Sequence, residues 1–212
     1  MNRIQAINQQ FGAQATAAEF NYVPQAPADP IISLSTGFKA DKDPRKVNLG
    51  VGAYRDENGK PLVFPVVRKA EEMLIAKKLD KEYSPIDGDQ EFLKGARGVL
   101  FGFNHSDVTS GRVASAQTLS GSGALRVLGE FIQKFRPAPI YVSNPTWGNH
   151  NQMFNAMGFN VRQYRYFHKQ TKGLDFEGMI TDLKNATPGS IVLLHTCAHN
   201  PTGVDPTFDQ WK

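Results

Sequence analysis

Cysteine is nearly absent from this sequence, since Cys197 is the only one in 212 residues. A single cysteine excludes a disulfide framework within the chain and favours a reducing compartment. No apolar run approaches the roughly 20 residues of a membrane-spanning helix. The first twenty residues contain one basic residue, Arg3, and lack the charged and apolar regions of a secretory signal. We therefore expect a cytoplasmic protein with no membrane partner, and a mitochondrial location is not excluded.

Charge of one sign is not concentrated either. Lys and Arg total 24 against 20 Asp and Glu, which gives a net charge of +4. Basic and acidic side chains are interspersed, as where Arg45 and Lys46 follow Asp41 and Asp43. A nucleic-acid binder needs a clustered basic face that releases counterions. We expect no nucleic-acid partner, and the 40% share of hydrophobic residues fits a globular protein with a substantial core.

Strand and helix patterns alternate from residue 47 onward. Apolar periodicity predicts helices over 65–77, 90–102, 124–135, 150–157 and 176–185, and strands over 140–142, 161–166 and 191–194. Such alternation favours an α/β fold with a largely parallel sheet and helices on both faces. In the helix over 90–102 we expect Phe92, Ala96 and Leu100 to face inward. Asp205 and Pro206 resemble an N-cap and first residue, so a helix begins there and has only one or two turns before Lys212.

The first segment with chemical potential is Ser120-Gly121-Ser122, at the predicted start of a helix. Free backbone N–H groups, hydroxyl donors and the positive end of the helix dipole suit a phosphate. The segment is neither a Walker loop, which needs Lys followed by Ser or Thr, nor a dinucleotide fingerprint, because Arg126 replaces the third glycine. A plain serine-capped turn explains the segment equally well.

The second segment follows the strand over 140–142 and contains Trp147 and His150. Open α/β sheets bind ligands at the carboxyl ends of their strands. An indole placed there can stack on a flat heteroaromatic ring. By itself, however, Trp147 fits a core or rim aromatic better.

The third segment, His195 to Gly203, follows the strand over 191–194 and allows three readings. As a zinc site, His195, Cys197 and His199 lack a fourth ligand and the usual spacing. As a nucleophile, Cys197 lacks evidence that a histidine lies beside it in space. In the third reading, Asn200 is a polar donor on the rigid turn Asn-Pro-Thr-Gly, and His195 and Cys197 are packed scaffold.

Five segments, in this order, resemble the aspartate aminotransferases of the class I pyridoxal phosphate-dependent family. The resemblance covers roughly residues 30–212, and Asn-Pro-Thr-Gly alone is common to many related enzymes. The segments begin at Asn48, Glu82, Leu119, Ser143 and Cys197: NLGVGAYR, EYSPIDG, LSGSGALR, SNPTW and CAHNPTG. The resemblance implies the large domain of a fold type I transferase over 62–212, the N-terminal portion of a small domain over 29–61, and an N-terminal arm over 1–28.

The resemblance also implies a pyridoxal 5'-phosphate site. Ser120, Gly121 and Ser122 would hold the cofactor phosphate, although the family more often has Thr at position 122. Trp147 would stack on the ring and also line the substrate site. Asn200 would donate a hydrogen bond to the phenolic oxygen of the ring and would also contact the substrate. His150 would support the ring nitrogen indirectly, and Val51 and Gly52 would line the substrate side of the pocket. Tyr83 would contact the cofactor phosphate of the partner subunit in a homodimer. Asn144-Pro145 and Asn200-Pro201 resemble positions of cis peptide bonds.

The catalytic residues themselves are expected outside this chain. Transamination between L-aspartate or L-glutamate and 2-oxo acids needs a Schiff-base lysine and arginines that bind the substrate carboxylates. In the family these groups lie beyond the position that matches Lys212. We therefore expect an N-terminal fragment of an aminotransferase, inactive by itself and without a catalytic residue of its own.

Two alternatives from other classes stay open. One is a naturally short, non-catalytic relative that binds a phosphate ligand or a partner subunit. The other is an unrelated Cys/His metal protein. We also expect the isolated 212 residues to fold poorly, because an incomplete sheet and small domain would leave edges and apolar faces uncovered.

Overall fold

The computed structural model describes residues 22–24, 30–48, 50 and 52–212. The chain divides into two compact units, residues 1–81 and 82–212, and each is described by itself. Most of the expected N-terminal arm, residues 1–28, lies outside the described residues. The expected domain boundary near residue 62 stays a prediction.

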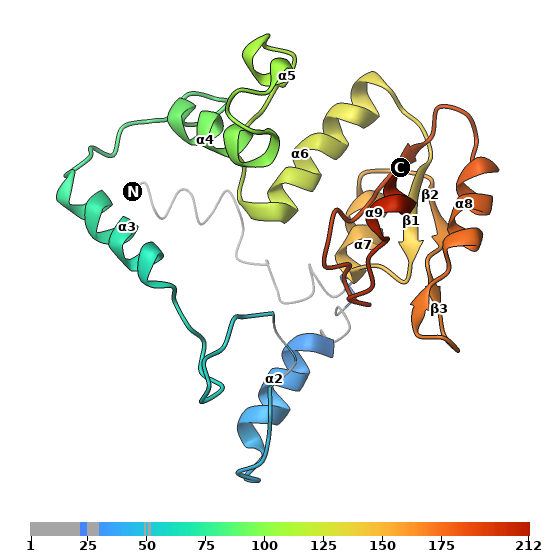
Figure 1. The fold of residues 1–212 in the computed structure, drawn as a ribbon, viewed down its shortest axis with the longest axis horizontal. Coiled ribbons are helices and arrows are strands. Elements are labelled where there is room, and N and C mark those ends of the chain that lie inside the picture. The colour runs from blue at the N-terminus through green and yellow to red at the C-terminus, as the bar shows by residue number, and fades with distance from the viewer. Residues whose placement is uncertain (1–21, 25–29, 49, 51) are drawn as a thin grey trace, which may run out of the picture. The chain divides into compact units, whose positions relative to one another are not determined.

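A parallel sheet forms the centre of residues 82–212. It contains β1 (Ile140–Asn144), β2 (Val161–Arg165) and β5 (Ile191–Val192) in the order β2-β1-β5. β1 pairs with β2 through Ile140↔Val161 and with β5 through Ile140↔Ile191, both in parallel register. The strands end in the same direction, so the residues that follow β1 and β5 emerge at one edge (Figure 1).

Helices cover both faces of this sheet, as the alternating pattern predicts. α6 (Ser120–Phe135) and α7 (Gly148–Ala156) lie on one face, and α8 (Phe176–Lys184) lies on the other (Figure 1). Because side chains alternate along a strand, β1 contributes to two cores. Ile140 and Val142 pack with Phe154 and Phe159 on the α6–α7 face. On the opposite face a second core joins Tyr141, Tyr164, Tyr166 and Met179.

The other elements of residues 82–212 are short. They are α4 (Gln90–Phe101), α5 (Ser106–Thr109), the antiparallel pair β3 (Phe167–His168) and β4 (Gly173–Leu174), and α9 (Phe208–Trp211). Two sequence expectations are wrong here. In α4 the buried residues are Leu93 and Gly98, whereas Phe92, Ala96 and Leu100 are exposed. The Phe103 ring folds back onto Gly98, where a side chain would collide with it, so tertiary contact selects the buried face.

The last helix begins later than its sequence pattern suggests. Its N-cap is Thr207, which forms a capping box with Gln210, and not Asp205. The Asp205 carboxylate instead accepts hydrogen bonds from the backbone N–H groups of Ala198 and His199. This correction places Asp205 at the candidate site.

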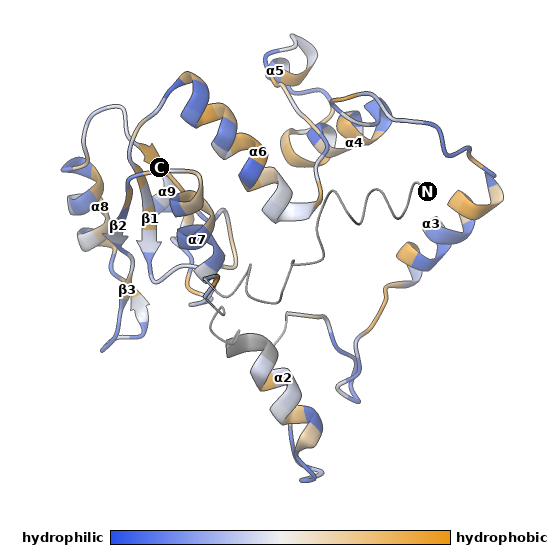
Figure 2. Cartoon of the chain, turned by 180° about the vertical axis from the view of Figure 1, so that it is seen from behind, coloured by the Kyte–Doolittle hydropathy of each residue, from blue (hydrophilic) through white to orange (hydrophobic). Residues whose placement is uncertain are grey.

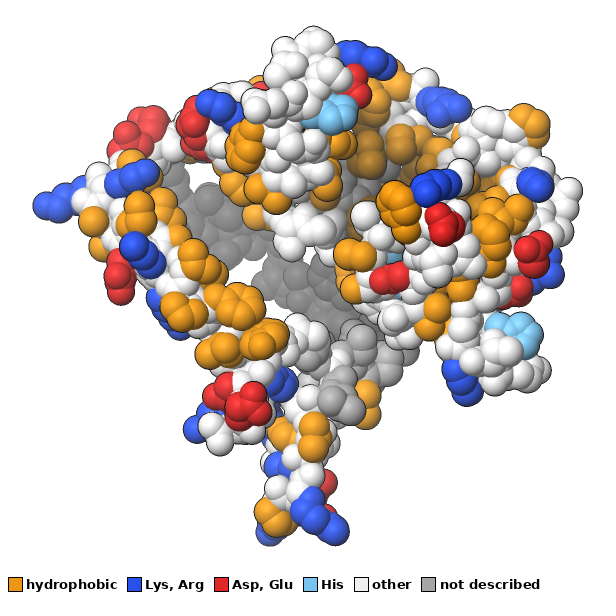
Figure 3. Space-filling model, in the orientation of Figure 1, with side chains coloured by type: hydrophobic (Ala, Val, Ile, Leu, Met, Phe, Trp, Pro, Cys, Tyr) orange, Lys and Arg blue, Asp and Glu red, His pale blue; other side chains and the backbone are white. Residues whose placement is uncertain are grey.

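Residues 1–81 contain two helices, α2 (Pro30–Ala40) and α3 (Pro65–Ala76). α3 is expected from the sequence, and Pro65 occupies its first turn. α2 is not expected, because its Ser, Thr and Gly residues are weak helix formers. No residue whose burial is described between 22 and 81 is buried. Figure 3 shows orange apolar side chains along α3, and these include Val66, Met73, Leu74 and Ile75.

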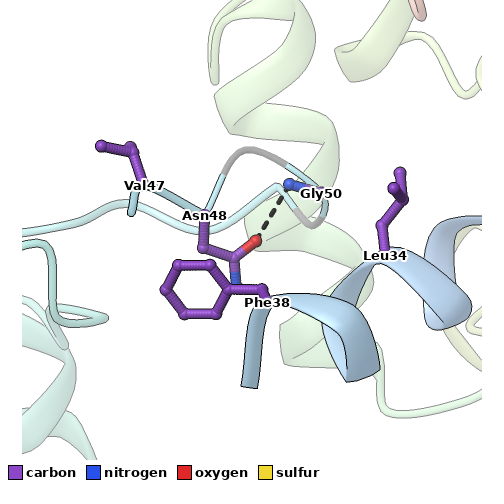
Figure 4. Close-up of a pocket in the computed structure, with 5 residues that line it drawn as sticks. All are labelled: Leu34, Phe38, Val47, Asn48 and Gly50. Carbon is purple, nitrogen blue, oxygen red and sulfur yellow. Dashed lines mark hydrogen bonds between the residues drawn. The ribbon is translucent and has the colours of Figure 1, made fainter. Parts of the chain in front are cut away.

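A shallow hollow lies beside α2. Leu34, Phe38, Val47, Asn48 and Gly50 line it (Figure 4). The Gly50 N–H donates to Asn48 Oδ1 at 3.0 Å, which closes a tight local turn.

Hydropathy along the chain is mixed elsewhere, and α6 carries both apolar and polar residues (Figure 2). Within the described ranges no helix combines the length and the apolar character that crossing a bilayer requires.

Candidate functional site at the carboxyl edge of the sheet

The segments that follow β1 and β5 are joined by hydrogen bonds at the carboxyl edge of the sheet. Thr146 Oγ1 lies 2.8 Å from His150 Nδ1 and 3.2 Å from His195 Nε2. Ser143 Oγ lies 2.8 Å from His199 Nε2. Two loops that are about fifty residues apart in the sequence are therefore held together by hydroxyl–imidazole bonds.

His150, His195 and His199 form a continuous group of rings, here called the histidine stack. His195 and His199 stack with centroids 4.2 Å apart, and His150 meets His195 edge-on at 5.2 Å. Tyr166 continues the stack on the far side of His199 at 3.9 Å. His199 is almost completely buried, and a buried imidazole needs its hydrogen bonds satisfied. Ser143 and Thr202 each provide a hydroxyl to it at 2.8 Å.

The histidine stack is uncharged at neutral pH. Burial, together with the neighbouring His195, lowers the pKa of His150 to about 4. Burial is also the main reason that the pKa of His199 falls to about 4, with His195 again adding to the effect. The pKa of His195 is lowered by burial as well. Protonating any of these rings would place a charge in a poorly solvated group of aromatic neighbours.

Hydrogen-bond polarity then fixes the direction of the chain of bonds. The Asn200 backbone N–H donates to His195 Nδ1 at 3.2 Å, so the neutral His195 carries its proton on Nε2. His195 Nε2–H therefore donates to Thr146 Oγ1, which in turn lies within hydrogen-bond distance of His150 Nδ1. In the tautomer in which the Thr146 hydroxyl donates to His150 Nδ1, the ring carries its proton on Nε2 and can donate it to a carboxylate.

Asn200 lies on a tightly bonded segment, residues 198–205, here called the Asn200 loop. Its side chain is exposed and makes no hydrogen bond with the described residues, so both amide groups are available. The predicted cis bonds at Asn144-Pro145 and Asn200-Pro201 are confirmed. The Gly203 N–H donates to the His199 carbonyl at 2.7 Å, and the Tyr166 hydroxyl donates to the Val204 carbonyl at 2.7 Å.

Trp147 lies directly before α7 at the carboxyl edge of the sheet. Its indole is half-buried and meets the His150 ring edge-on at 5.2 Å. One side of the ring system is thus supported by a buried imidazole. An indole fixed in this way can offer a flat surface to a ligand at lower entropic cost than a freely rotating one.

The segment Ser120-Gly121-Ser122 forms the first turn of α6, which has no side-chain cap. All three residues are exposed, and Ser120 has a φ of 57°. A Cβ added at Gly121 would meet nothing within 4 Å, so the space beside its backbone is open. The first N–H groups of a helix have no partner within the helix and point outward. This geometry fits an anion better than a serine-capped turn, since neither serine caps the helix.

This helix start lies at the same edge of the sheet as Trp147 and Asn200. α6 runs antiparallel to β1, so its first turn lies towards the end where β1 finishes (Figure 1). Leu125 and Ile132 of α6 pack against the core that contains Ile140 and Val142, so α6 lies directly on this face of the sheet. The phosphate-type segment, the indole and the free amide therefore gather at one edge within residues 82–212.

The expected roles of three further residues stay predictions. Tyr83 is 96% exposed and touches no part of the site. Gly52 is exposed and belongs to residues 1–81, whose position relative to the sheet is not fixed. Val51 lies outside the described residues.

The alternative readings of residues 195–203 are tested by the same contacts. His195 and His199 are engaged with hydroxyls and with each other, and Cys197 is exposed, which corrects its expected role as packed scaffold. Across the described part of the chain, no group of three or more His, Cys, Asp or Glu side chains is arranged to bind a metal ion.

Several residues that organise the site are missed by the sequence reasoning. Thr146, Ser143 and Thr202 provide the hydroxyls, and Asp205 binds the backbone of the Asn200 loop. Ser and Thr near strand ends are too common to be singled out. The pairing of Ser143 with His199 spans 56 residues, which no local pattern reveals.

Comparison with known proteins identifies the family of the chain. Residues 44–212 match the family described as aminotransferase class I and II. The chain is 51% identical over 200 residues to a cytoplasmic aspartate aminotransferase of Oryza sativa subsp. japonica, which covers 93% of this chain and 49% of that protein. It is 50% identical to a mitochondrial aspartate aminotransferase of Schizosaccharomyces pombe, over 89% of this chain and 43% of that protein.

Solved structures agree with the fold. An aspartate aminotransferase from the cytoplasm of Saccharomyces cerevisiae superposes with a TM-score of 0.85 at 39% identity, over 92% of this chain and 48% of that one. An aromatic-amino-acid aminotransferase from Burkholderia pseudomallei, covalently bound to pyridoxal phosphate, gives 0.86 at 41% identity, over 91% and 49%. The chain thus spans about half the length of the relatives it matches. Its parallel sheet, its site segments and these matches together show that the chain belongs to the class I and II aminotransferase family.

Proposed function

We propose that this chain is part of an aspartate aminotransferase that exchanges an amino group between L-aspartate or L-glutamate and 2-oxo acids. The observation that carries the proposal is the gathering of the α6 first turn, Trp147 and Asn200 at one edge of the sheet. Sequence identities of 51% and 50% to aspartate aminotransferases of rice and fission yeast favour this branch of the family. The chain spans about half of each relative, so the activity is assigned to the whole protein.

The residues at this edge fit pyridoxal 5'-phosphate. The exposed backbone at Gly121 and Ser122 offers N–H donors to the phosphate, and the helix dipole and the hydroxyls of Ser120 and Ser122 add to them. The Ser120 N–H itself donates to the Thr118 carbonyl. Gly121 leaves the space beside its backbone open, whereas a side chain would fill it. Ser122 keeps the hydroxyl that threonine would provide, so its replacement of threonine retains the hydrogen bond.

Trp147 and Asn200 fit the ring of the same cofactor. The half-buried indole provides a flat apolar surface, and the free Asn200 amide provides a donor for an anionic ring oxygen. His150 Nδ1 pairs with the Thr146 hydroxyl, which leaves Nε2 to donate to a carboxylate that supports the ring nitrogen, in the tautomer that this role requires. When bound, pyridoxal 5'-phosphate supplies an electron sink for breaking bonds at the amino-acid α-carbon.

The chain's own contribution to catalysis is therefore binding and orientation. The uncharged histidine stack holds the Asn200 backbone and the Thr146 hydroxyl in one hydrogen-bonded chain. Such positioning converts into rate because reacting groups held in place lose less entropy during the reaction. The Schiff-base lysine and the substrate arginines that the resemblance implies would come from the rest of the enzyme.

The whole enzyme is proposed to be a homodimer in the cytoplasm. Tyr83 has an exposed ring and a hydroxyl that can reach a phosphate on a neighbouring subunit. The cytoplasmic location is supported by the 51% identity to the cytoplasmic relative of rice, while the mitochondrial relative of fission yeast is 50% identical.

The experiment that tests the proposal is an intact-mass measurement. The protein from its natural source is incubated with pyridoxal phosphate and reduced with borohydride. A mass about twice that of this chain, with one pyridoxyl adduct, would support the proposal that these residues form about half of an active aminotransferase. A mass that matches 212 residues without an adduct would contradict it and would favour a non-catalytic binding protein.

A further inference from the structure

The Asn200 loop contains a carboxylate whose function is not explained by charge pairing. The two oxygens of Asp205 accept from two successive backbone N–H groups, from Ala198 at 2.7 Å and from His199 at 2.9 Å. No described cation forms an ion pair with Asp205 within 4.0 Å, and its side chain does not cap α9. Its pKa is lowered, mainly by the hydrogen bonds from His199 and Ala198, so the carboxylate is ionised at neutral pH.

The residue that Asp205 binds has an unfavourable backbone conformation. Ala198 has a φ of 50°, in the left-handed region that non-glycine residues rarely adopt. Such a conformation persists only when neighbouring contacts impose it, and it occurs preferentially at functional sites. Bonds from a charged acceptor to both the Ala198 and His199 N–H groups provide contacts of that kind, because charge-assisted hydrogen bonds are stronger than neutral ones.

We propose that Asp205 is a positioning residue that holds Ala198 in the left-handed conformation and thereby aims the Asn200 amide at the cofactor. Asn200 follows directly after the two residues whose N–H groups Asp205 binds, and its own N–H donates to His195. The direction of its side chain is therefore set by the backbone on its N-terminal side. This inference rests on the proposed function only for the identity of the cofactor.

The two hydrogen bonds that Asp205 accepts also influence how the histidine stack is bonded. His199 has its N–H on Asp205 and its ring between Ser143 and Thr202, so the backbone and the ring are fixed from opposite sides. If the backbone at Ala198 relaxed, the Asn200 N–H would move away from His195 Nδ1. The hydrogen-bonded chain to His150 would then lose its first donor.

The test uses Asp205→Asn in the full-length protein. An asparagine can accept from only one of the two N–H groups and turns an N–H₂ donor towards the other. The matched control is Asp209→Asn, which removes the same charge from an exposed side chain paired only with Lys212. Hydrogen exchange, thermal unfolding, steady-state kinetics and absorbance of bound pyridoxal phosphate against pH are compared for both.

We expect faster amide exchange at Ala198 and His199 in Asp205→Asn, with exchange in β1 and β2 unchanged. The value of kcat falls on the order of tenfold or more, because a displaced polar group loses its alignment. The pH at which the absorbance of the bound cofactor changes rises, since loss of the Asn200 donor destabilises an anionic ring oxygen. Asp209→Asn behaves as the wild type in each measurement.

A rescue variant separates positioning from mere stability. Glycine adopts a φ of 50° without steric cost, so adding Ala198→Gly to Asp205→Asn should restore part of the lost kcat and part of the lost protection from amide exchange at His199. Unchanged exchange at Ala198 and His199, or equally faster exchange throughout β1 and β2, would overturn the proposal. If the wild type shows no aminotransfer, the proposed function fails, while the exchange comparison still decides the role of Asp205.

Discussion

The two units of this chain bury their apolar side chains to different extents. Among the residues whose burial is described, every buried apolar one lies in residues 82–212. In residues 1–81 the helices α2 and α3 have no buried residue among those whose burial is described. Both units contain amphipathic patterns, so the pattern identifies an apolar face without showing that anything covers it.

The difference explains why the site is built in residues 82–212. A ligand site needs side chains held by packing and by satisfied hydrogen bonds. The histidine stack lies against buried Tyr166 and Ser143, whereas the hollow beside α2 is shaped by one short turn. Substitutions placed in each unit in turn test this difference in burial.

The largest effect concerns the chain by itself. The isolated 212 residues are expected to bind the dye 8-anilinonaphthalene-1-sulfonate and to lack a sharp unfolding transition, because the apolar side chains of α3 and α6 are exposed. Dye fluorescence and calorimetry measure this. A cooperative melt of a soluble monomer would show that these surfaces do not matter.

A matched pair of substitutions compares the two cores directly in the full-length protein. Phe154→Ala is expected to lower the free energy of unfolding by about 3–5 kcal/mol, because the ring is 4% exposed and fills the α6–α7 core. Phe64→Ala, at 47% exposed, should cost less than about 1 kcal/mol. Urea unfolding followed by circular dichroism checks both. Equal losses would mean that residues 1–81 are as well covered as the sheet.

The next effect comes from a single buried hydroxyl. Ser143→Ala leaves His199 Nε2 buried without its partner, which should cost about 1–3 kcal/mol. Ser106→Ala, at an exposed position of α5, is the control. Urea unfolding monitored by tryptophan fluorescence suits the comparison, because Trp147 and Trp211 both lie in residues 82–212. No difference between the two variants would mean that the Ser143–His199 bond is dispensable.

Stability of residues 82–212 should decrease as the pH falls from about 6.5 to about 4. The pKa values of His150 and His199 are lowered to about 4 in the folded state, so the unfolded state binds more protons in this range. The unfolded state is favoured by each proton that it gains. Tryptophan-monitored unfolding at several pH values measures the slope, and His150→Asn should reduce it. A slope that His150→Asn leaves unchanged would argue against this origin.

The smallest effect distinguishes a helix cap from a surface ion pair. Asp175 caps α8 by accepting from the Gly178 N–H at 2.9 Å, and Asp175→Ala should cost about 1 kcal/mol. Glu71→Ala removes the exposed pair with Arg68 on α3 and should cost less than about 0.5 kcal/mol. Thermal unfolding measures both, and the reverse order would contradict the comparison.

Much of the fold could be predicted from the sequence because its signals are local. The helix over 90–102 and the strand over 161–166 match α4 and β2 to within a residue. α2 was not predicted, because its Ser, Thr and Gly residues have low helix propensity, although Ile31, Leu34 and Phe38 follow helical spacing. The inward face of α4 was predicted wrongly, because Phe103 packs on Gly98 from outside the helix.

The candidate site was predicted in part for the same reason. Ser120, Trp147 and Asn200 lie next to turn residues in recognisable motifs, and the structure brings them to one edge. Thr146 and Asp205 gain their functions from partners that lie elsewhere in the chain. Asp205 in particular has the local pattern of a helix N-cap, but its carboxylate accepts hydrogen bonds from the backbone N–H groups of Ala198 and His199 instead.

By itself the sequence determined the alternation of strands and helices, the phosphate-type helix start and the Asn-Pro turns. Each of these follows from the chemistry of neighbouring residues: the period of apolar side chains, free N–H groups at a helix start and the restricted backbone of proline. Only the tertiary structure decided which faces are covered and how the three histidines are bonded. Those properties depend on which distant groups meet, and their burial lowers the pKa values of His150 and His199.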